Sequence, residues 1–127
     1  MPKTVLIADD DAVTVATLSA AVRDLGLNVI VARDTLQTVM AAQRSSPDVI
    51  LLDIQMPGGT GLEALKRLNN SSRTQGIPVI VVTSSEDKAL PDRVRELGAR
   101  DFMRKPVAHA DLKRLLLTIL KPEPAGE

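Results

Sequence analysis

The chain of 127 residues is 44% hydrophobic and 25% charged, which is typical of one globular domain with its own core. Sixteen basic residues balance sixteen acidic ones, so the charge indicates neither direct binding of nucleic acid nor an anionic membrane partner, and no apolar run approaches the roughly 20 residues of a membrane span. The lack of cysteine excludes disulfides and thiolate metal sites, and without a signal-peptide pattern at the start we expect a cytoplasmic protein.

Short apolar runs alternate with segments of helical spacing along the chain. The first four runs are rich in valine and isoleucine and show little alternation, which predicts strands buried on both faces of a parallel sheet. In chain order we expect strands at 4–8, 28–32, 49–52, 79–82 and 102–103, and helices at 12–25, 35–44, 61–68, 92–97 and 111–120. This (βα)5 order predicts an α/β fold with helices on both faces of the sheet.

Local signals predict where several helices begin and end. Gly26 and Gly98 are expected to stop the first and fourth helices, and Asp34 to cap the second. The turn-like residues 69–72 are expected to end the third helix. Proline is tolerated only in the first turn of a helix, so Pro91 predicts that the fourth helix begins next to it and that a loop comes before.

Polar residues follow the predicted strands at one edge of the sheet. The first strand is followed by Asp9 and Asp10, the third by Asp53, the fourth by Thr83 and the fifth by Lys105. Because ligands of such sheets bind beyond the carboxyl ends of the strands, we expect these residues to share a site. Two carboxylates about 4 Å apart repel by roughly 4 kcal/mol at an effective dielectric of 20, so three together require a cation or a proton. Mg²⁺ suits oxygen ligands, and a lysine with a hydroxyl suits a phosphoryl group.

These residues resemble the receiver domain of two-component response regulators, of the CheY-like type. The matching segments, in family order and spacing, are residues 7–11, 52–57 with Gly61 after them, 81–84, 97–99 and 102–106. The resemblance implies a doubly wound, five-stranded parallel sheet of the CheY/flavodoxin-like kind with strand order 2-1-3-4-5. We expect the receiver domain at residues 1–121 and a flexible C-terminal tail at 122–127.

The resemblance also implies a role for each residue of the acidic edge. Asp53 is implied as the phosphoacceptor, whose carboxylate takes a phosphoryl group from a phosphohistidine. Asp10, Asp53 and the carbonyl of Gln55 are implied as direct ligands of Mg²⁺, with Asp9 acting through water. Lys105 is implied to pair with Asp53 and then with its phosphoryl group.

The resemblance further implies residues that change conformation when Asp53 is phosphorylated, and residues that set the lifetime of the phosphoaspartate. Thr83 matches the hydroxyl that moves to bond a phosphoryl oxygen, and the amide of Ser84 matches a backbone donor. Phe102 matches the aromatic ring that turns inward as Thr83 moves. Gln55 and Ser85 match positions that tune the lifetime of the phosphoaspartate.

On the output side, the resemblance implies signalling through the surface of the fourth helix, fifth strand and fifth helix to a downstream protein or a second copy of the chain. The phosphodonor is implied to be a sensor histidine kinase or a phosphotransfer protein, and no enzyme activity is expected beyond self-catalysed phosphotransfer and autodephosphorylation. The bond before Pro106 is implied to be cis. Phe102 stands where relatives carry tyrosine, and Pro91 alters the fourth helix, so this surface departs from the family pattern.

Other readings of the acidic residues stay open at this point. Asp9 and Asp11 fit the nucleophile and general acid of a haloacid-dehalogenase-like phosphatase, although this reading leaves residues 53–57 unexplained. Asp11 also fits a helix N-cap. A receiver-shaped interaction module that no longer takes phosphate would keep the same fold. A flavodoxin-like binder of FMN fits poorly, because its phosphate loop would be rich in serine, threonine and glycine and here it is acidic.

Overall fold

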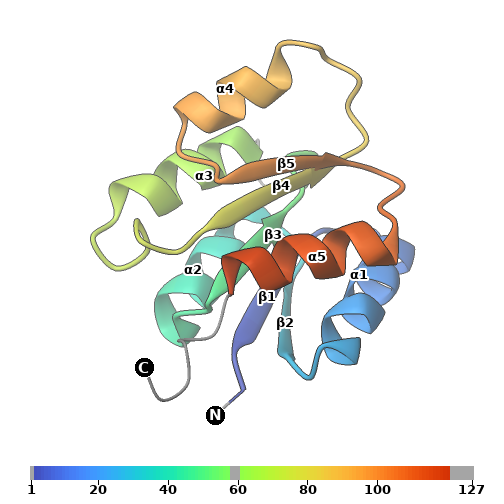
Figure 1. The fold of residues 1–127 in the computed structure, drawn as a ribbon. Helices are drawn as coiled ribbons and strands as arrows, with labels where there is room; N and C mark the ends of the chain where they lie inside the picture. Colours follow the sequence, from blue (N-terminus) through green and yellow to red (C-terminus); the bar gives the residue numbers. More distant parts are fainter. Residues whose placement is uncertain (1, 58–60, 121–127) are drawn as a thin grey trace.

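The structure, a computed structural model, describes residues 2–57 and 61–120. Over these residues the predicted alternation of strands and helices is confirmed (Figure 1). In chain order the elements are β1 (Thr4–Ala8), α1 (Ala12–Asp24), β2 (Asn28–Ala32), α2 (Thr35–Ser45), β3 (Val49–Leu52), α3 (Gly61–Asn70), β4 (Val79–Thr83), α4 (Leu90–Glu96), β5 (Asp101–Arg104) and α5 (His109–Ile119). The tail predicted at 122–127 lies outside the described residues.

The described strands form one parallel sheet in the predicted order β2-β1-β3-β4-β5. The interior strands β1, β3 and β4 are buried except at Thr4, as their unbroken apolar sequences predict. The prediction of burial on both faces is wrong for β2, in which Asn28 and Val31 are exposed. An edge strand has a neighbour on one side only, so the layers that cover the sheet reach it less completely.

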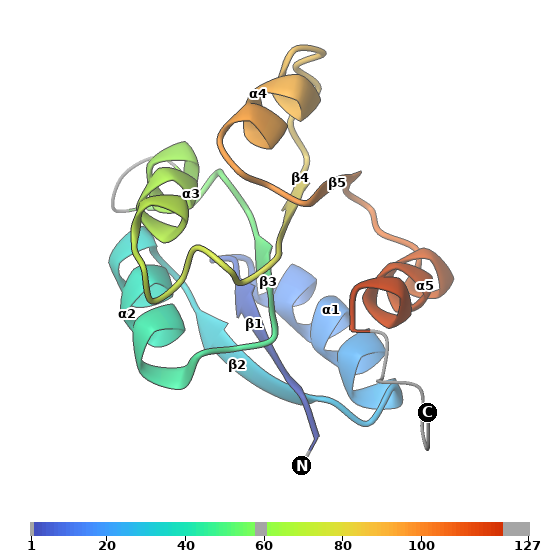
Figure 2. The ribbon, with the colours of Figure 1, turned by 60° about the vertical axis from the view of Figure 1, so that its left-hand side comes forward.

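Helices cover the two faces of the sheet and enclose two separate groups of buried side chains (Figure 2). On one face, α1 and α5 bury residues such as Val22 and Leu112 against the sheet. On the other, α2, α3 and α4 bury residues such as Leu65 and Val94. Both groups draw side chains from the interior strands, because successive residues of a strand point to opposite faces.

The ends of the helices follow the predicted local signals in most cases. Asp34 caps α2 by accepting the N–H of Gln37 at 2.7 Å. Gly26 and Gly98 have φ angles of 76° and 107°, left-handed values that glycine adopts without strain. The helix α4 begins at Leu90 with proline in its first turn, as predicted.

Two predicted boundaries are wrong. The helix α3 continues through Asn70, because the turn that was expected at residues 69–72 begins only after that residue. The helix α5 begins at His109, earlier than the apolar spacing suggested. Both errors concern polar residues at helix ends, where hydrophobic spacing carries no information.

Among the described residues, no helix is both long and apolar enough to cross a membrane.

Candidate functional site

Backbone hydrogen bonds extend the sheet one residue past the ends of its strands and thereby position the predicted site residues. The N–H of Asp9 donates to a carbonyl at the end of β2 at 3.0 Å, and that of Asp53 donates to a carbonyl at the end of β1 at 2.9 Å. The N–H of Lys105 donates to the carbonyl of Thr83 at 2.9 Å. The side chains of these residues therefore start from the same edge of the sheet, as the sequence predicted.

Three carboxylates of the described chain meet at this edge. One oxygen each of Asp9, Asp10 and Asp53 lie within 4.8 Å of one another. Asp9 and Asp53 are buried, with 1% and 4% of their surfaces exposed, whereas Asp10 is exposed. The N–H of Asp11 donates to Asp9 Oδ1 and the N–H of Gln55 to Asp53 Oδ1, both at 2.9 Å. This set of oxygen donors, open to solvent on the side of Asp10, fits a Mg²⁺ ion that keeps several waters.

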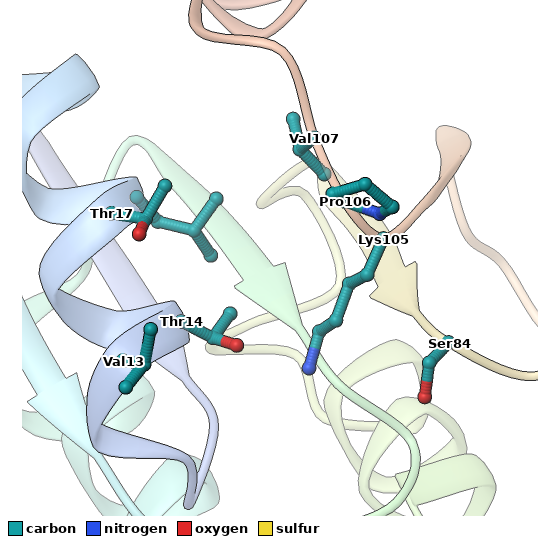
Figure 3. Close-up of a pocket in the computed structure, with 8 residues that line it drawn as sticks. Val13, Thr14, Thr17, Ser84, Lys105, Pro106 and Val107 are labelled. Atoms are coloured by element: carbon teal, nitrogen blue, oxygen red, sulfur yellow. The ribbon is translucent and has the colours of Figure 1, made fainter.

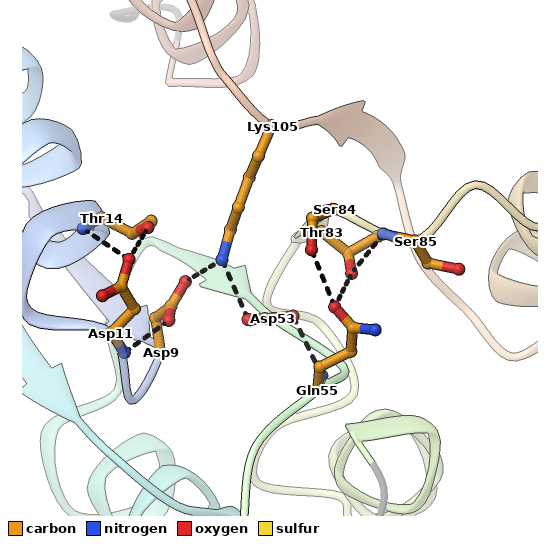
Figure 4. A network of polar contacts seen from close by, with 9 residues as sticks. All are labelled: Asp9, Asp11, Thr14, Asp53, Gln55, Thr83, Ser84, Ser85 and Lys105. Carbon is orange, nitrogen blue, oxygen red and sulfur yellow. Dashed lines mark hydrogen bonds and ion pairs between the residues drawn. The ribbon is translucent and has the colours of Figure 1, made fainter.

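Lys105 lies between the two buried carboxylates (Figure 4). Its Nζ donates to Asp9 Oδ2 at 2.7 Å and to Asp53 Oδ2 at 3.0 Å. The resemblance implied the pair with Asp53, and the contact with Asp9 is an addition to it. Lys105 supplies one of the cations that the clustered acids require, and the remaining excess of negative charge still favours a bound metal ion.

Burial and hydrogen bonding act in opposite directions on the charges of this site. Burial raises the pKa of Asp9 above its ordinary value, and the hydrogen bond from Lys105 offsets only part of this effect. For Lys105, burial alone would lower the pKa, but the hydrogen bonds to Asp9 and Asp53 together raise it. Lys105 is therefore cationic at neutral pH. The ionised carboxylate of Asp9 lowers the free energy of unfolding.

Asp11 does not belong to the carboxylate cluster of Asp9, Asp10 and Asp53 and instead caps α1. Its Oδ2 accepts the backbone N–H of Thr14 at 3.2 Å and the hydroxyl of Thr14 at 2.6 Å. The bonds from Thr14 lower the pKa of Asp11. A general acid must hold a proton, so this environment speaks against the phosphatase reading, in which Asp11 would be that acid.

Two hydroxyl groups at the end of β4 bond to the side chain of Gln55. Thr83 Oγ1 donates to Gln55 Oε1 at 3.3 Å, and Ser84 Oγ donates to the same oxygen at 3.0 Å. The N–H of Ser85 in turn donates to Thr83 Oγ1 at 3.3 Å. Most of the predicted site residues are thus connected as one network around Asp53, from Lys105 on one side to Gln55 on the other, whereas Asp10, Phe102 and Pro106 are not part of it (Figure 4).

Phe102 is half-buried on the α4 side of the sheet and packs against the buried residues there. The guanidinium carbon of Arg104 lies 5.4 Å from the centre of the Phe102 ring, and Arg104 Nη2 donates to the carbonyl of Asp87 at 3.2 Å. Arg104 thereby connects β5 to the loop before α4. This contact was not predictable from the sequence, because an arginine on an edge strand has the pattern of a residue in solvent. The Lys105–Pro106 peptide bond that follows is cis.

A pocket of about 410 Å³ opens beside Lys105, between the start of α1 and the loop from β5 to α5 (Figure 3). Its lining includes Val13, Thr14, Thr17 and Val107. Sequence reasoning missed this pocket because it is formed by segments far apart in the chain. One signal was present in the sequence, since Val13 lies outside the apolar stripe of α1 formed by Val15, Leu18 and Val22. In the structure Val13 is 73% exposed.

Comparison with known proteins identifies relatives along nearly the whole chain. The model of the response regulator receiver domain family matches residues 5–117. Protein PilH of Pseudomonas aeruginosa is 35% identical over 118 residues, which cover 91% of this chain and 96% of PilH. The solved receiver domain of the sensor histidine kinase PA1611 of P. aeruginosa is 25% identical with a TM-score of 0.87, and the match covers 96% of this chain and all of that one. That receiver has a magnesium ion coordinated in its active site cleft.

A third relative is longer than the chain. The probable transcriptional regulatory protein TcrX of Mycobacterium tuberculosis is 34% identical over 122 residues, which cover 94% of this chain and 50% of TcrX. The chain thus spans half the length of that relative and nearly the full length of PilH.

Proposed function

The chain belongs to the response regulator receiver domain family, and from this membership we propose that it takes a phosphoryl group on Asp53 and signals through the surface of α4, β5 and α5. Receiver domains of two-component systems interact with histidine kinases and with downstream targets, and they generally bind Mg²⁺ at an acidic site. The observation that carries the proposal is the buried carboxylate of Asp53, held between Lys105 and the acids that follow β1.

The proposed reaction is the transfer of a phosphoryl group from a phosphohistidine. A carboxylate oxygen of Asp53 forms a bond to phosphorus while the bond from phosphorus to the histidine nitrogen breaks, and the departing imidazole takes a proton from solvent. Asp53 is suited to this attack because Lys105 and the N–H of Gln55 hold its two oxygens in fixed directions. Lys105 then faces the negative charge of the phosphoryl group at short range.

Asp9, Asp10 and Asp53 would hold the metal ion that the family uses, with the carbonyl of Gln55 as a further proposed ligand. When bound, Mg²⁺ would neutralise charge on the transferring oxygens. The excess of negative charge supports this assignment, since the cluster holds three carboxylates and the ammonium of Lys105 pairs with two of them, Asp9 and Asp53. No activity beyond this transfer and the hydrolysis of the chain's own phosphoaspartate is proposed.

The proposed output begins at Thr83 and passes to the edge of the sheet. A phosphoryl group on Asp53 would attract the hydroxyl of Thr83, and the space behind it would accept the ring of Phe102. Moving such a two-state equilibrium from mostly off to mostly on requires about 5.5 kcal/mol of differential binding, which a few charge-assisted hydrogen bonds can supply. The half-buried position of Phe102 next to α4 supports this route.

For the partners we propose a phosphohistidine protein on the input side and a protein target, or a second copy of the chain, on the output side. The pocket beside Lys105 supports an input partner with an apolar surface, since Val13 and Val107 line the approach to the site. We also propose that residues 1–121 act as the receiver unit and that the exchange takes place in the cytoplasm, as the lack of cysteine favours.

Labelling with a small phosphodonor tests the proposal. The chain is incubated with acetyl phosphate and Mg²⁺, and intact-mass measurement is expected to reveal one added phosphoryl group, which Asp53→Asn abolishes and the exposed control Asp92→Asn retains. Omission of Mg²⁺ is expected to slow labelling strongly.

Two outcomes would replace the proposal by one of its rivals. Labelling that survives in Asp53→Asn and disappears in Asp9→Asn would support the phosphatase reading. A folded chain that takes no label, with no shift in melting temperature on addition of Mg²⁺, would support an interaction module that does not use phosphate.

A further inference from the structure

The side chain of Gln55 is directed at the end of β4 (Figure 4). Gln55 lies two residues after Asp53, the proposed phosphoacceptor that follows β3, and Thr83 ends the neighbouring strand β4. The amide oxygen of Gln55 accepts the hydroxyl of Thr83 at 3.3 Å and that of Ser84 at 3.0 Å. Gln55 itself is exposed, whereas Thr83 is fully buried, so the contact joins a surface side chain to a buried hydroxyl.

The hydrogen of the Thr83 hydroxyl can serve one strong acceptor at a time. A threonine hydroxyl has a single O–H donor, and in this structure it is directed to Gln55 Oε1. The same hydroxyl oxygen already accepts the N–H of Ser85 at 3.3 Å. A bond from Thr83 to a phosphoryl oxygen on Asp53 would therefore replace the bond to Gln55.

We propose that Gln55 is a positioning residue that holds Thr83 away from Asp53 until the phosphoryl group competes for its hydroxyl. This inference rests on the proposed function, and it adds a threshold to the switch. A charged phosphoryl oxygen is a stronger acceptor than a neutral amide, so the competition ends in favour of the phosphorylated state. The amide oxygen of Gln55 lessens that advantage by the strength of one neutral hydrogen bond.

Ser84 fixes the orientation of the Gln55 amide. Its hydroxyl donates to the same oxygen at the shorter distance of 3.0 Å, so the amide presents its oxygen rather than its NH₂ group to β4. Ser84 is exposed and acts on Thr83 only through Gln55 in this arrangement. Removing the Ser84 hydroxyl is therefore expected to weaken the hold on Thr83 without changing Thr83 itself.

The test measures the affinity for beryllofluoride, a phosphoryl mimic, at saturating Mg²⁺. The reporter is the NMR signal of the Phe102 ring, because the sequence contains one phenylalanine and neither tyrosine nor tryptophan. Gln55→Leu, which keeps most of the side-chain volume and lacks the acceptor, is expected to bind three- to tenfold more tightly, the equivalent of one neutral hydrogen bond. Ser84→Ala is expected to change the affinity in the same direction by a smaller factor.

A double-mutant cycle separates action through Thr83 from direct action on the ligand. In a Thr83→Val background, Gln55→Leu and Ser84→Ala are both expected to leave the affinity unchanged. An equal effect of Gln55→Leu in both backgrounds, or weaker binding in the wild-type background, would overturn the proposal. Failure of the wild-type chain to bind beryllofluoride at all would instead overturn the proposed phosphoacceptor function on which the inference rests.

Discussion

Asp9 combines a buried carboxylate with a close cationic neighbour, and the balance between the two decides its effect on stability. Its pKa in the folded chain is raised, chiefly by burial, above the ordinary value of 3.8. An acid with a raised pKa contributes stability that is fully present below its unfolded pKa and is lost as the pH rises through the folded pKa. Near neutral pH the ionised Asp9 therefore lowers the free energy of unfolding.

Replacing this carboxylate by an amide is expected to stabilise the metal-free protein. Asp9→Asn removes the buried negative charge, while Lys105 keeps its partner Asp53 at 3.0 Å. Thermal unfolding without Mg²⁺ is expected to give a higher melting temperature for Asp9→Asn than for the wild type near pH 7, and the difference should shrink as the pH falls towards 3.8. The exposed Asp92→Asn serves as the control. A variant less stable than the wild type at pH 7 would contradict this reading of the charge balance.

The residue types of the site were predictable, but several of their side-chain contacts were not. Asp9, Asp53 and Lys105 could be placed at one edge because each follows a recognisable strand. The bond from Lys105 to Asp9 depends on the directions of two side chains across neighbouring strands, which spacing in the sequence does not determine. The same holds for Arg104, which reaches the carbonyl of Asp87 across the edge of the sheet.

At the scale of single elements, the entry into α3 is tightly constrained. The N–H of Gly61 donates to the carbonyl of Ile54 at 2.9 Å, and a Cβ on Gly61 would overlap the backbone Cα of Ile54. Backbone atoms cannot rotate aside as a long side chain can. The glycine that the receiver resemblance highlighted therefore has a physical role, which is to let α3 begin directly against the backbone of Ile54, just after β3.

Gly61→Ala is expected to lower the free energy of unfolding by about 1–3 kcal/mol, the usual cost of inserting a methyl group into a packed contact. Gly76→Ala is the matched control, because a Cβ there would meet no atom within 4 Å. Urea unfolding of both variants measures the difference. Equal urea midpoints for the two variants would mean that the start of α3 accommodates the added methyl group with little loss in the free energy of unfolding.

The start of α4 and the end of α3 illustrate what local sequence signals can and cannot predict. Pro91 marked the start of α4 correctly, because proline restricts the backbone at its own position whatever surrounds it. The end of α3 was placed too early, because Asn69 and Asn70 resemble turn residues by composition yet lie in the last turn of the helix. Tertiary packing of α3 outweighs the weak preference of those side chains.

At the scale of the whole molecule, the sheet divides the interior into two cores. Val22 of α1 belongs to one core and Val94 of α4 to the other, and neither has exposed surface. Side chains of the interior strands alternate between the two cores, so each core repacks largely on its own side.

Truncations on opposite faces are therefore expected to act independently. Val22→Ala and Val94→Ala should each cost about 1–3 kcal/mol, and the double variant should match their sum within about 0.5 kcal/mol. Urea unfolding of the four proteins, including the wild type, measures the interaction term. A large deviation from additivity would mean that strain crosses the sheet.

The overall arrangement was predicted by two routes of different strength. The alternation of strands and helices followed from hydrophobic spacing, which is a local property. The strand order came from the receiver resemblance, because the pairing of parallel strands depends on long-range packing that no local window contains. The exposure of β2 did not follow from its apolar sequence, because hydrophobic spacing alone does not reveal which strands lie at the edges.

The place of β5 in the sheet has a mechanical consequence. Among the described strands, β5 forms hydrogen bonds with β4 alone, whereas β1, β3 and β4 each have a hydrogen-bonded neighbour on both sides. In the proposed switch, a displacement at the end of β4 would therefore disturb fewer strand pairings toward β5, which carries Phe102 and Arg104, than toward β3 at the centre of the sheet.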